Sequence, residues 1–286
     1  MAAEKVIFTN VKGQSIELTN RMPFLLESVE GKGDVSANVQ MQSAPFQDGA
    51  TFIDTTLETR TLELIVNIKA YSRDELNLLR QQISSIFNPR LGLGKLTYSN
   101  GNSEREIEVV SAGIPIFPTG EAKGKWFQRT VINLIAPNPY WEDTIEENYK
   151  LEDFVGSFRF PFTLPTRFST RGDSKVLANY GDVPTPIEVE FRGPVTNPVI
   201  TNESTGEFIR INRAIPVGYK LILDTSFGNK RVEIIAPDGT TMNGFHFIDL
   251  QSTFFGLDIG DNRIGFVAEG GSPEVYIRYK HRYLSV

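Results

Sequence analysis

The sequence predicts a mainly β protein that contains a single α-helix and two domains. Three observations lead to this prediction. Most of the chain consists of short runs in which apolar and polar residues alternate with period two, as they do in half-buried strands. One segment, residues 72–87, has helical spacing instead. Near the middle of the chain, the proline-rich stretch "APNPYWED" at residues 136–143 breaks the pattern.

The composition fits a folded protein and excludes several kinds of site. With 286 residues, of which 40% are hydrophobic, the chain is long enough to form two cores. It has no cysteine, which excludes disulfides, thiolate zinc sites and cysteine nucleophiles. The net charge of −6 is spread evenly over the two halves, so the sequence offers no basic surface for nucleic acid.

The N-terminal stretch "MAAEKVIFTN" lacks the apolar core of a signal peptide. No run of apolar residues reaches the length of about eighteen that a membrane-spanning helix needs. We therefore expect a protein that is made in the cytoplasm and does not insert into membranes.

Strands in the first half of the chain are expected at residues 5–10, 14–20, 59–71, 95–100, 104–110 and 126–135. The turn "NVKGQS" between the first two predicts a hairpin. In the third strand the alternating apolar residues share one face: Leu62, Leu64, Val66 and Ile68.

The helix is predicted from residues 72–87, "SRDELNLLRQQISSIF". Its apolar residues recur at spacings of three and four: Leu76, Leu79, Ile83 and Ile86. Ser72 and Glu75 have the spacing of a capping box, and Asn88-Pro89 ends the helix. A helix with one apolar stripe is expected to cover a face of the surrounding sheet.

Residues 39–60, "VQMQSAPFQDGATFIDTTLETR", are expected to form a long polar loop with isolated apolar anchors at Pro45, Phe46 and Phe52. Long loops in compact domains are usually functional. We therefore expect this loop to contact a neighbouring molecule.

Residues 144–157 are polar and lack a period, which predicts a linker between an N-terminal domain, residues 1–143, and a C-terminal domain, residues 158–286. Alternating phenylalanines with two prolines at residues 158–168 indicate an edge strand. Short strand-like runs separated by turn residues then continue to the end of the chain. This pattern predicts an antiparallel β-sandwich or jelly roll.

No catalytic or metal-binding motif is present. The two histidines, His246 and His281, have no partner at metal-ligand spacing, and neither a nucleophile elbow nor a phosphate-binding loop occurs. We expect no enzymatic activity, no cofactor and no metal. The aromatic residues Trp126, Tyr140 and Trp141 could stack against sugars or bases, or pack at strand ends and at a domain junction.

The junction residues Pro137, Pro139, Tyr140 and Trp141 have a physical role of their own. Proline cannot donate to a sheet ladder, so the preceding strand has to stop there. The two large aromatic side chains can then bury area against one or both domains. We expect these four residues to form a stiff inter-domain junction.

Three segments, in this order, resemble the distal tail proteins of siphophages and phage-like elements of Gram-positive bacteria. The first is "WFQRTVINLIAPNPYWED", and the second is "VTNPVITNESTGEFIRINRAIPVGYKLILDTSFGNKRVEI". The third is "DLQSTFFGLDIGDNRIGF", which is followed by a last strand rich in tyrosine and arginine. Together they cover about half of the chain.

This resemblance implies a structural virion protein of the tail-tip baseplate. The N-terminal domain, with β-structure and the helix, would form a homo-hexameric ring, and the C-terminal domain would be a galectin-like β-sandwich. The implied partners are the tail tube protein, a tail-tip hub protein of the tail-associated lysin type, and the tape-measure protein. DNA would pass through the ring without sequence-specific binding, and assembly would take place in the cytoplasm of the bacterial host.

Contacts between ring subunits are expected from strand edges and from the long loop. The candidate contact residues are Leu62, Leu64, Val66, Ile68, Pro45, Phe46 and Phe52. The alternative function is that of a carbohydrate-binding module, in which the C-terminal sandwich recognises host cell-wall polysaccharide through surface aromatic residues.

Overall fold

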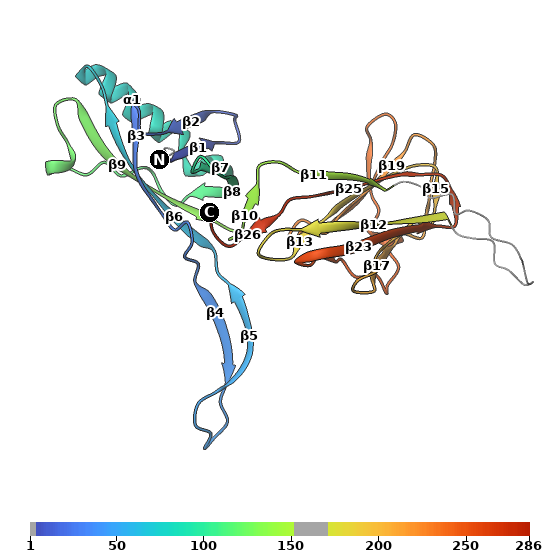
Figure 1. The fold of residues 1–286 in the computed structure, drawn as a ribbon. Coiled ribbons are helices and arrows are strands. Elements are labelled where there is room, and N and C mark those ends of the chain that lie inside the picture. The colour runs from blue at the N-terminus through green and yellow to red at the C-terminus, as the bar shows by residue number, and fades with distance from the viewer. Residues whose placement is uncertain (1–3, 152–170) are drawn as a thin grey trace, which may run out of the picture. The chain divides into compact units, whose positions relative to one another are not determined.

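The computed structural model describes residues 4–151 and 171–286, which divide into two compact units (Figure 1). The first unit consists of Met1–Thr144 together with Tyr283–Val286, and the second consists of Ile145–Arg282. The chain therefore passes between the units twice, once after Thr144 and once after Arg282.

The first unit is built on one antiparallel sheet with the strand order β2-β1-β7-β8-β9-β6-β3. Its strands are β1 (Lys5–Thr9), β2 (Ser15–Leu18), β3 (Phe24–Glu30), β6 (Arg60–Lys69), β7 (Gly94–Ser99), β8 (Glu104–Ser111) and β9 (Phe127–Ala136). A short strand, β10 (Trp141–Asp143), pairs with β8. The predicted hairpin of the first two strands is confirmed, because Val6 pairs with Leu18 and Thr9 with Ser15.

Helix α1 (Arg73–Ile86) packs against this sheet and is the only α-helix among the described residues. Leu76, Ile83 and Ile86 are buried in the same core as the sheet residues, as the spacing predicts. The Ser72 hydroxyl accepts a hydrogen bond from the Glu75 amide at 3.1 Å, while the Glu75 carboxylate accepts one from the Tyr71 amide. A 3₁₀ turn, η1 (Pro89–Leu91), follows the helix.

Residues 37–57 form a two-stranded antiparallel hairpin, which corrects the expectation of an irregular polar loop at residues 39–60. Strands β4 (Ala37–Gln42) and β5 (Thr51–Leu57) pair only with each other, and we call them the ribbon. Figure 1 shows the ribbon projecting from the body of the first unit. Polar and apolar residues alternate in β4 but not in β5, where Phe52 and Ile53 are adjacent at a register shift. Neither face of the ribbon joins the core, so the segment lacks the strong apolar signal of a buried strand.

The second unit is an antiparallel β-sandwich, as the sequence predicts, and with the first unit it makes the described part of the chain mainly β with one α-helix. The larger sheet has the order β11-β25-β14-β19-β20-β21 and the smaller has the order β12-β23-β16-β17. The larger sheet contains β11 (Glu147–Leu151), β14 (Glu188–Arg192), β19 (Lys220–Asp224), β20 (Arg231–Ile235), β21 (Thr241–Asn243) and β25 (Glu274–Tyr279). The smaller contains β12 (Arg171–Asn179), β16 (Val199–Asn202), β17 (Glu207–Arg210) and β23 (Gly260–Ala268).

The inward faces of these two sheets share one apolar core. It includes Val189 and Phe191 of β14, Ile277 of β25, and Ile264 and Phe266 of β23. Phe191 and Phe266 meet edge to face across the sandwich, with ring centroids 6.3 Å apart.

Part of the segment expected to be a linker belongs to the second unit. Glu147–Leu151 form β11, which pairs with β25, and Leu151 is buried. The segment has alternating residues but too few apolar ones to be read as a strand, because only one of its faces is covered. The expected edge strand at residues 158–168 lies outside the described residues. Among the described residues, no helix is long and apolar enough to span a membrane.

Replacement of the capping residue tests the structure of the helix. Ser72→Ala is expected to lower the unfolding free energy of the first unit by about 1 kcal/mol, because the Glu75 amide loses its acceptor. The control Ser85→Ala lies at an exposed position of the same helix and is expected to change it by less than about 0.5 kcal/mol. Urea unfolding followed by circular dichroism measures both. Equal effects of the two changes would contradict the assigned cap.

Candidate assembly interface

Four of the candidate contact residues lie in the core of the first unit. Leu62, Leu64, Val66 and Ile68 are fully buried, and their strand β6 is hydrogen-bonded to β9 on one edge and to β3 on the other. A strand paired on both edges cannot also pair with a neighbouring subunit. These four residues therefore stabilise the fold, and the expectation that they contact another subunit is corrected.

The ribbon, in contrast, exposes an apolar face. In the pairing of β4 with β5, Met41 lies opposite Phe52, and Val39 lies two residues before Met41 on the same face. Leu57 lies further along this face, opposite Ala37. Met41 and Phe52 are 61% and 62% exposed. The opposite face carries Asn38, Gln40, Asp54 and Thr56. An amphipathic ribbon with an uncovered apolar face is typical of an element that is buried in an assembly.

The turn of the ribbon holds Phe46 away from the rest of the unit. Phe46 is fully exposed and has a φ of 65°, in the left-handed region that bulky residues rarely adopt. The turn is closed by two hydrogen bonds, from the Gln47 amide to the Ala44 carbonyl and from the Ala44 amide to the Gln47 side chain. Pro45 is exposed beside it. Strain of this kind concentrates at functional positions.

The ribbon and its flanking residues 37–59 are also acidic. They contain Asp48, Asp54 and Glu58 and no lysine or arginine. Within the described part of the chain, none of the three carboxylates forms an ion pair. The ribbon therefore offers a partner both apolar area and uncompensated negative charge.

A buried arginine anchors the base of the ribbon. Arg60, which follows the ribbon, is 1% exposed, and its guanidinium donates to three main-chain carbonyls. It donates to Gly31 at 2.8 Å, to Pro139 at 2.7 Å and to Leu284 at 2.6 Å. Burial lowers the pKa of Arg60, and the charge of Asp34 opposes this shift. The guanidinium remains protonated, and it ties three distant segments of the first unit together.

Gly31 makes this arrangement possible. Its φ is +83°, and a Cβ atom at this position would lie 2.0 Å from the carbonyl oxygen of Thr61. Only glycine allows the chain that enters the ribbon to pass so close to the strand that leaves it.

One of the four predicted junction residues contacts this arginine, and a second is buried in the core. Trp141 is fully buried in the core of the first unit, where its indole Nε1 donates to the Lys32 carbonyl at 3.1 Å and its ring meets that of Tyr98. Tyr140 is half-buried, and Pro137 is exposed. Pro139 contributes the carbonyl that accepts from Arg60. Their role as an inter-domain junction stays a prediction.

The returning C-terminal residues complete the site. The Tyr283 hydroxyl donates to the Asp143 carboxylate at 3.1 Å, and the Arg105 guanidinium lies 3.4 Å from the centroid of the Tyr283 ring. Arg105 also donates to the Ser285 carbonyl. We call the three hydrogen bonds of Arg60 to main-chain carbonyls the Arg60 clamp. The sequence predicts neither this clamp nor the return of Tyr283–Val286 to the first unit, because a main-chain carbonyl can belong to any residue type.

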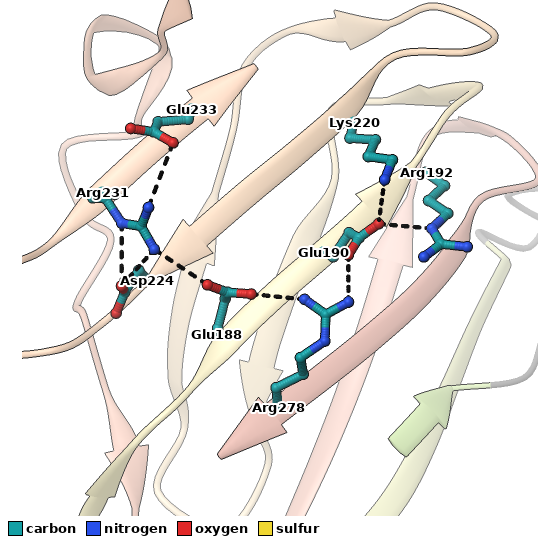
Figure 2. Close-up of polar contacts among 8 residues, drawn as sticks. All are labelled: Glu188, Glu190, Arg192, Lys220, Asp224, Arg231, Glu233 and Arg278. Atoms are coloured by element: carbon teal, nitrogen blue, oxygen red, sulfur yellow. Dashed lines mark hydrogen bonds and ion pairs between the residues drawn. The ribbon is translucent and has the colours of Figure 1, made fainter. Parts of the chain in front are cut away.

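A second polar arrangement lies on the larger sheet of the second unit (Figure 2). Arg278 bridges Glu188 and Glu190 at 2.7 and 2.6 Å, and Arg231 bridges Asp224 and Glu188 at 3.0 and 3.2 Å. The other members are Arg192, Lys220 and Glu233, which join from neighbouring strand positions. The eight charges sum to zero, so this face is neutralised by its own residues.

Glu190 contacts three cations of this network and is 4% exposed. Burial by itself would raise its pKa, but hydrogen bonds from Arg192 and Arg278 outweigh burial and lower the pKa to about 2. The carboxylate therefore stays ionised, and its charge stabilises the folded sheet.

The remaining candidate residues are not brought together into a site. Trp126 is 51% exposed in the first unit, far in sequence from the histidines of the second unit. His281 is buried and accepts a hydrogen bond from the Tyr180 amide, whereas His246 is exposed in a 3₁₀ turn. No group of three metal-ligating side chains occurs in residues 4–151 and 171–286.

Two protein families match the chain, one in each unit. Residues 11–136 match the family described as the phage tail protein RIFT-related domain. Residues 180–283 match the C-terminal domain of the siphovirus-type tail component. Together these ranges include the ribbon, most of the sheet of the first unit and most of the sandwich. No curated protein sequence matches the chain.

Solved structures share the fold over the full length. The Dit protein of phage SPP1, a hub of the adsorption apparatus in phages that infect Gram-positive bacteria, aligns with a TM-score of 0.67. It is 14% identical, and the alignment covers 97% of this chain and 98% of that one. A chain from the activated baseplate of phage P2 aligns with a TM-score of 0.58 and 11% identity, over 100% of both chains.

Removal of the buried guanidinium tests the clamp. Arg60→Met keeps much of the length of the side chain but removes the donor of three carbonyls in one step, so it is expected to lower the unfolding free energy of the first unit by about 3 kcal/mol. The control Arg90→Met replaces an exposed arginine of the same unit. Urea unfolding measures the difference. A loss no larger than that of the control would show that the clamp is not stabilising.

The pH dependence of stability tests the role of Glu190. A pKa lowered from 4.5 to about 2 stabilises the fold at pH values above 4.5, and this contribution is lost as the pH falls through about 2. At pH 7, Glu190→Gln is expected to lower the unfolding free energy of the second unit by on the order of 2 kcal/mol.

The difference between parent and Glu190→Gln should then shrink as the pH falls from 4.5 to 2 in a series of urea titrations. Glu233→Gln is the matched control, because its contact with Arg231 is longer, at 3.7 Å. A difference that stays constant over this pH range would refute the assignment.

Proposed function

Because the chain belongs to the family of siphophage distal tail proteins, we propose that it forms a hexameric ring at the distal end of the tail tube. In this role it is a non-enzymatic structural protein of the virion tail and its baseplate. The ring joins the tube to the tail-tip apparatus that adsorbs to the host. The shared fold of the baseplate chain from phage P2 supports this role.

The observation that carries the proposal is the uncovered apolar face of the ribbon. Met41, Phe52 and Phe46 are exposed on an element that projects from the first unit and contributes nothing to its core (Figure 1). Burial of these side chains against a neighbouring subunit would remove apolar area from water. A contact between two different surfaces of identical copies is the kind that closes a ring.

The further partners follow from the position of such a ring. One face would meet the tail tube protein, and the other would hold a tail-tip hub protein of the tail-associated lysin type. The tape-measure protein and then DNA would pass through the centre. The net charge of −6 suits a passage through which DNA moves without binding. Recognition of cell-wall polysaccharide by the second unit stays an alternative, which binding of the purified chain to host cell walls would reveal.

Replacement of the apolar face tests the ring. Met41→Asp combined with Phe52→Asp is expected to abolish rings while leaving the unfolding free energy unchanged, because both side chains are exposed in the single chain. The control Asn38→Asp with Gln40→Asp adds the same charge on the opposite face of the ribbon. Native mass spectrometry and negative-stain imaging measure the number of subunits in each assembly, both with and without purified tail tubes. If the parent chain stays monomeric in both settings, the proposed ring is wrong.

A further inference from the structure

A pocket of about 300 Å³ lies between helix α1 and the segment before β9. The helix contributes Arg73, Leu76, Asn77 and Arg80, and the segment contributes Lys123, Gly124 and Lys125. Four of these seven residues are cations and none is acidic. The pocket is therefore strongly positive and lies entirely within the first unit.

The four cations lack the counter-charges that such a cluster needs. Within the described ranges, none of them forms an ion pair with a carboxylate. The Arg80 Nε atom is buried and has no hydrogen-bond partner, and its guanidinium lies 4.5 Å from the centroid of the Phe117 ring. Four cations that line one pocket without counter-charges make this pocket suited to receive an anionic ligand.

Two aromatic side chains are exposed beside the pocket. Trp126 and Phe127 directly follow Lys125, the last lysine of the pocket. The Lys125 ammonium lies 4.9 Å from the centroid of the Trp126 ring. Arginine, tryptophan and phenylalanine are enriched in protein interfaces, which favours a polypeptide ligand over a free ion.

The ribbon has the complementary chemistry. It combines three unpaired carboxylates with an exposed apolar face, whereas the pocket combines four unpaired cations with an exposed apolar rim. Asp48 lies in the turn of the ribbon beside Phe46, so a carboxylate and an aromatic ring would arrive together. Complementary charge next to apolar area gives both specificity and affinity.

The ribbon of one chain cannot reach the pocket of the same chain. The ribbon joins the body of the unit at Arg60, the first residue of β6. The pocket lies at the other end of this strand, where the Ala70 amide donates to the Trp126 carbonyl, next to Lys125. The ten residues of β6 span about 33 Å. Figure 1 shows the ribbon pointing away from helix α1.

We propose that the basic pocket between α1 and residues 123–125 is the receptor for the acidic ribbon of a neighbouring copy. This inference rests on the proposed ring and names its contact surfaces. Donor and receptor surfaces at opposite ends of one strand make the contact head to tail, so each subunit gives one ribbon and receives one. The attraction is partly electrostatic and weakens as salt is added.

Two full-length variants test this contact by charge reversal. The first, Arg73→Glu/Lys123→Glu/Lys125→Glu, keeps its ribbon and reverses the charge of its pocket. The second, Asp48→Lys/Asp54→Lys/Glu58→Lys, keeps its pocket and reverses the charge of its ribbon. Alone, each is expected to associate with itself about 100-fold more weakly than the parent chain.

When the two variants are mixed, the intact ribbon of one can bind the intact pocket of the other. The reversed ribbon and the reversed pocket are complementary as well, so sedimentation velocity should then detect mixed assemblies of the two variants that salt dissociates. A variant that carries all six substitutions, so that the charges of ribbon and pocket are both reversed, should regain most of its self-association. The control Lys12→Glu/Arg21→Glu/Arg90→Glu makes the same charge change at exposed positions of the first unit and should associate like the parent.

A crosslink reports the location directly, since the chain contains no cysteine of its own. Asp48→Cys in one copy and Lys125→Cys in another should form an intermolecular disulfide in the assembled state, whereas Asp48→Cys with Lys12→Cys should not.

One outcome would overturn this inference and leave the proposed function standing. In it, the Met41/Phe52 variant forms no rings, whereas the pocket variant forms rings to the same extent as the control variant. A parent chain that never assembles, even on tail tubes, would overturn both.

Discussion

A single buried guanidinium holds the first unit together at the point where its most distant segments meet. Arg60 donates to carbonyls at residues 31, 139 and 284, which belong to the entry of the ribbon, the proline-rich stretch and the returning C-terminal residues. A charged group without a carboxylate partner in hydrogen-bond contact is retained in the interior only if several acceptors replace its water. The ribbon therefore starts from a fixed base, although its strands pair only with each other.

The same alternating pattern has opposite meanings in two parts of this unit. In β6 it marks a face that is buried in the core, and in the ribbon it marks a face that no part of the described chain covers. Period two tells which side chains point the same way, but not what lies opposite them. For this reason the sequence predicts subunit contacts at Phe46 and Phe52, which are exposed, but also at Leu62 and Leu64, which are buried.

Most of the fold was predictable because its signals are local. The helix follows from its apolar spacing and its serine cap, and the strands of both units follow from alternation and turn residues. Strand β3 was missed, since its bulge near Leu26 and Ser28 disrupts the alternation. The clamp, the basic pocket and the charge network depend on long-range placement. Arg60 and Leu284 are 224 positions apart, and no spacing rule connects them.

The brief return of Tyr283–Val286 to the first unit makes residues 145–282 an insertion within it. The two points of entry are close in space, because Asp143 and Tyr283 are joined by a hydrogen bond. A domain whose entry and exit lie side by side can be removed or replaced without separating the ends of the host fold. Joining Thr144 directly to Tyr283 would delete the second unit and leave the first with a short connection. Such an architecture allows lineages to replace the sandwich with another module while the host fold and its ribbon stay the same.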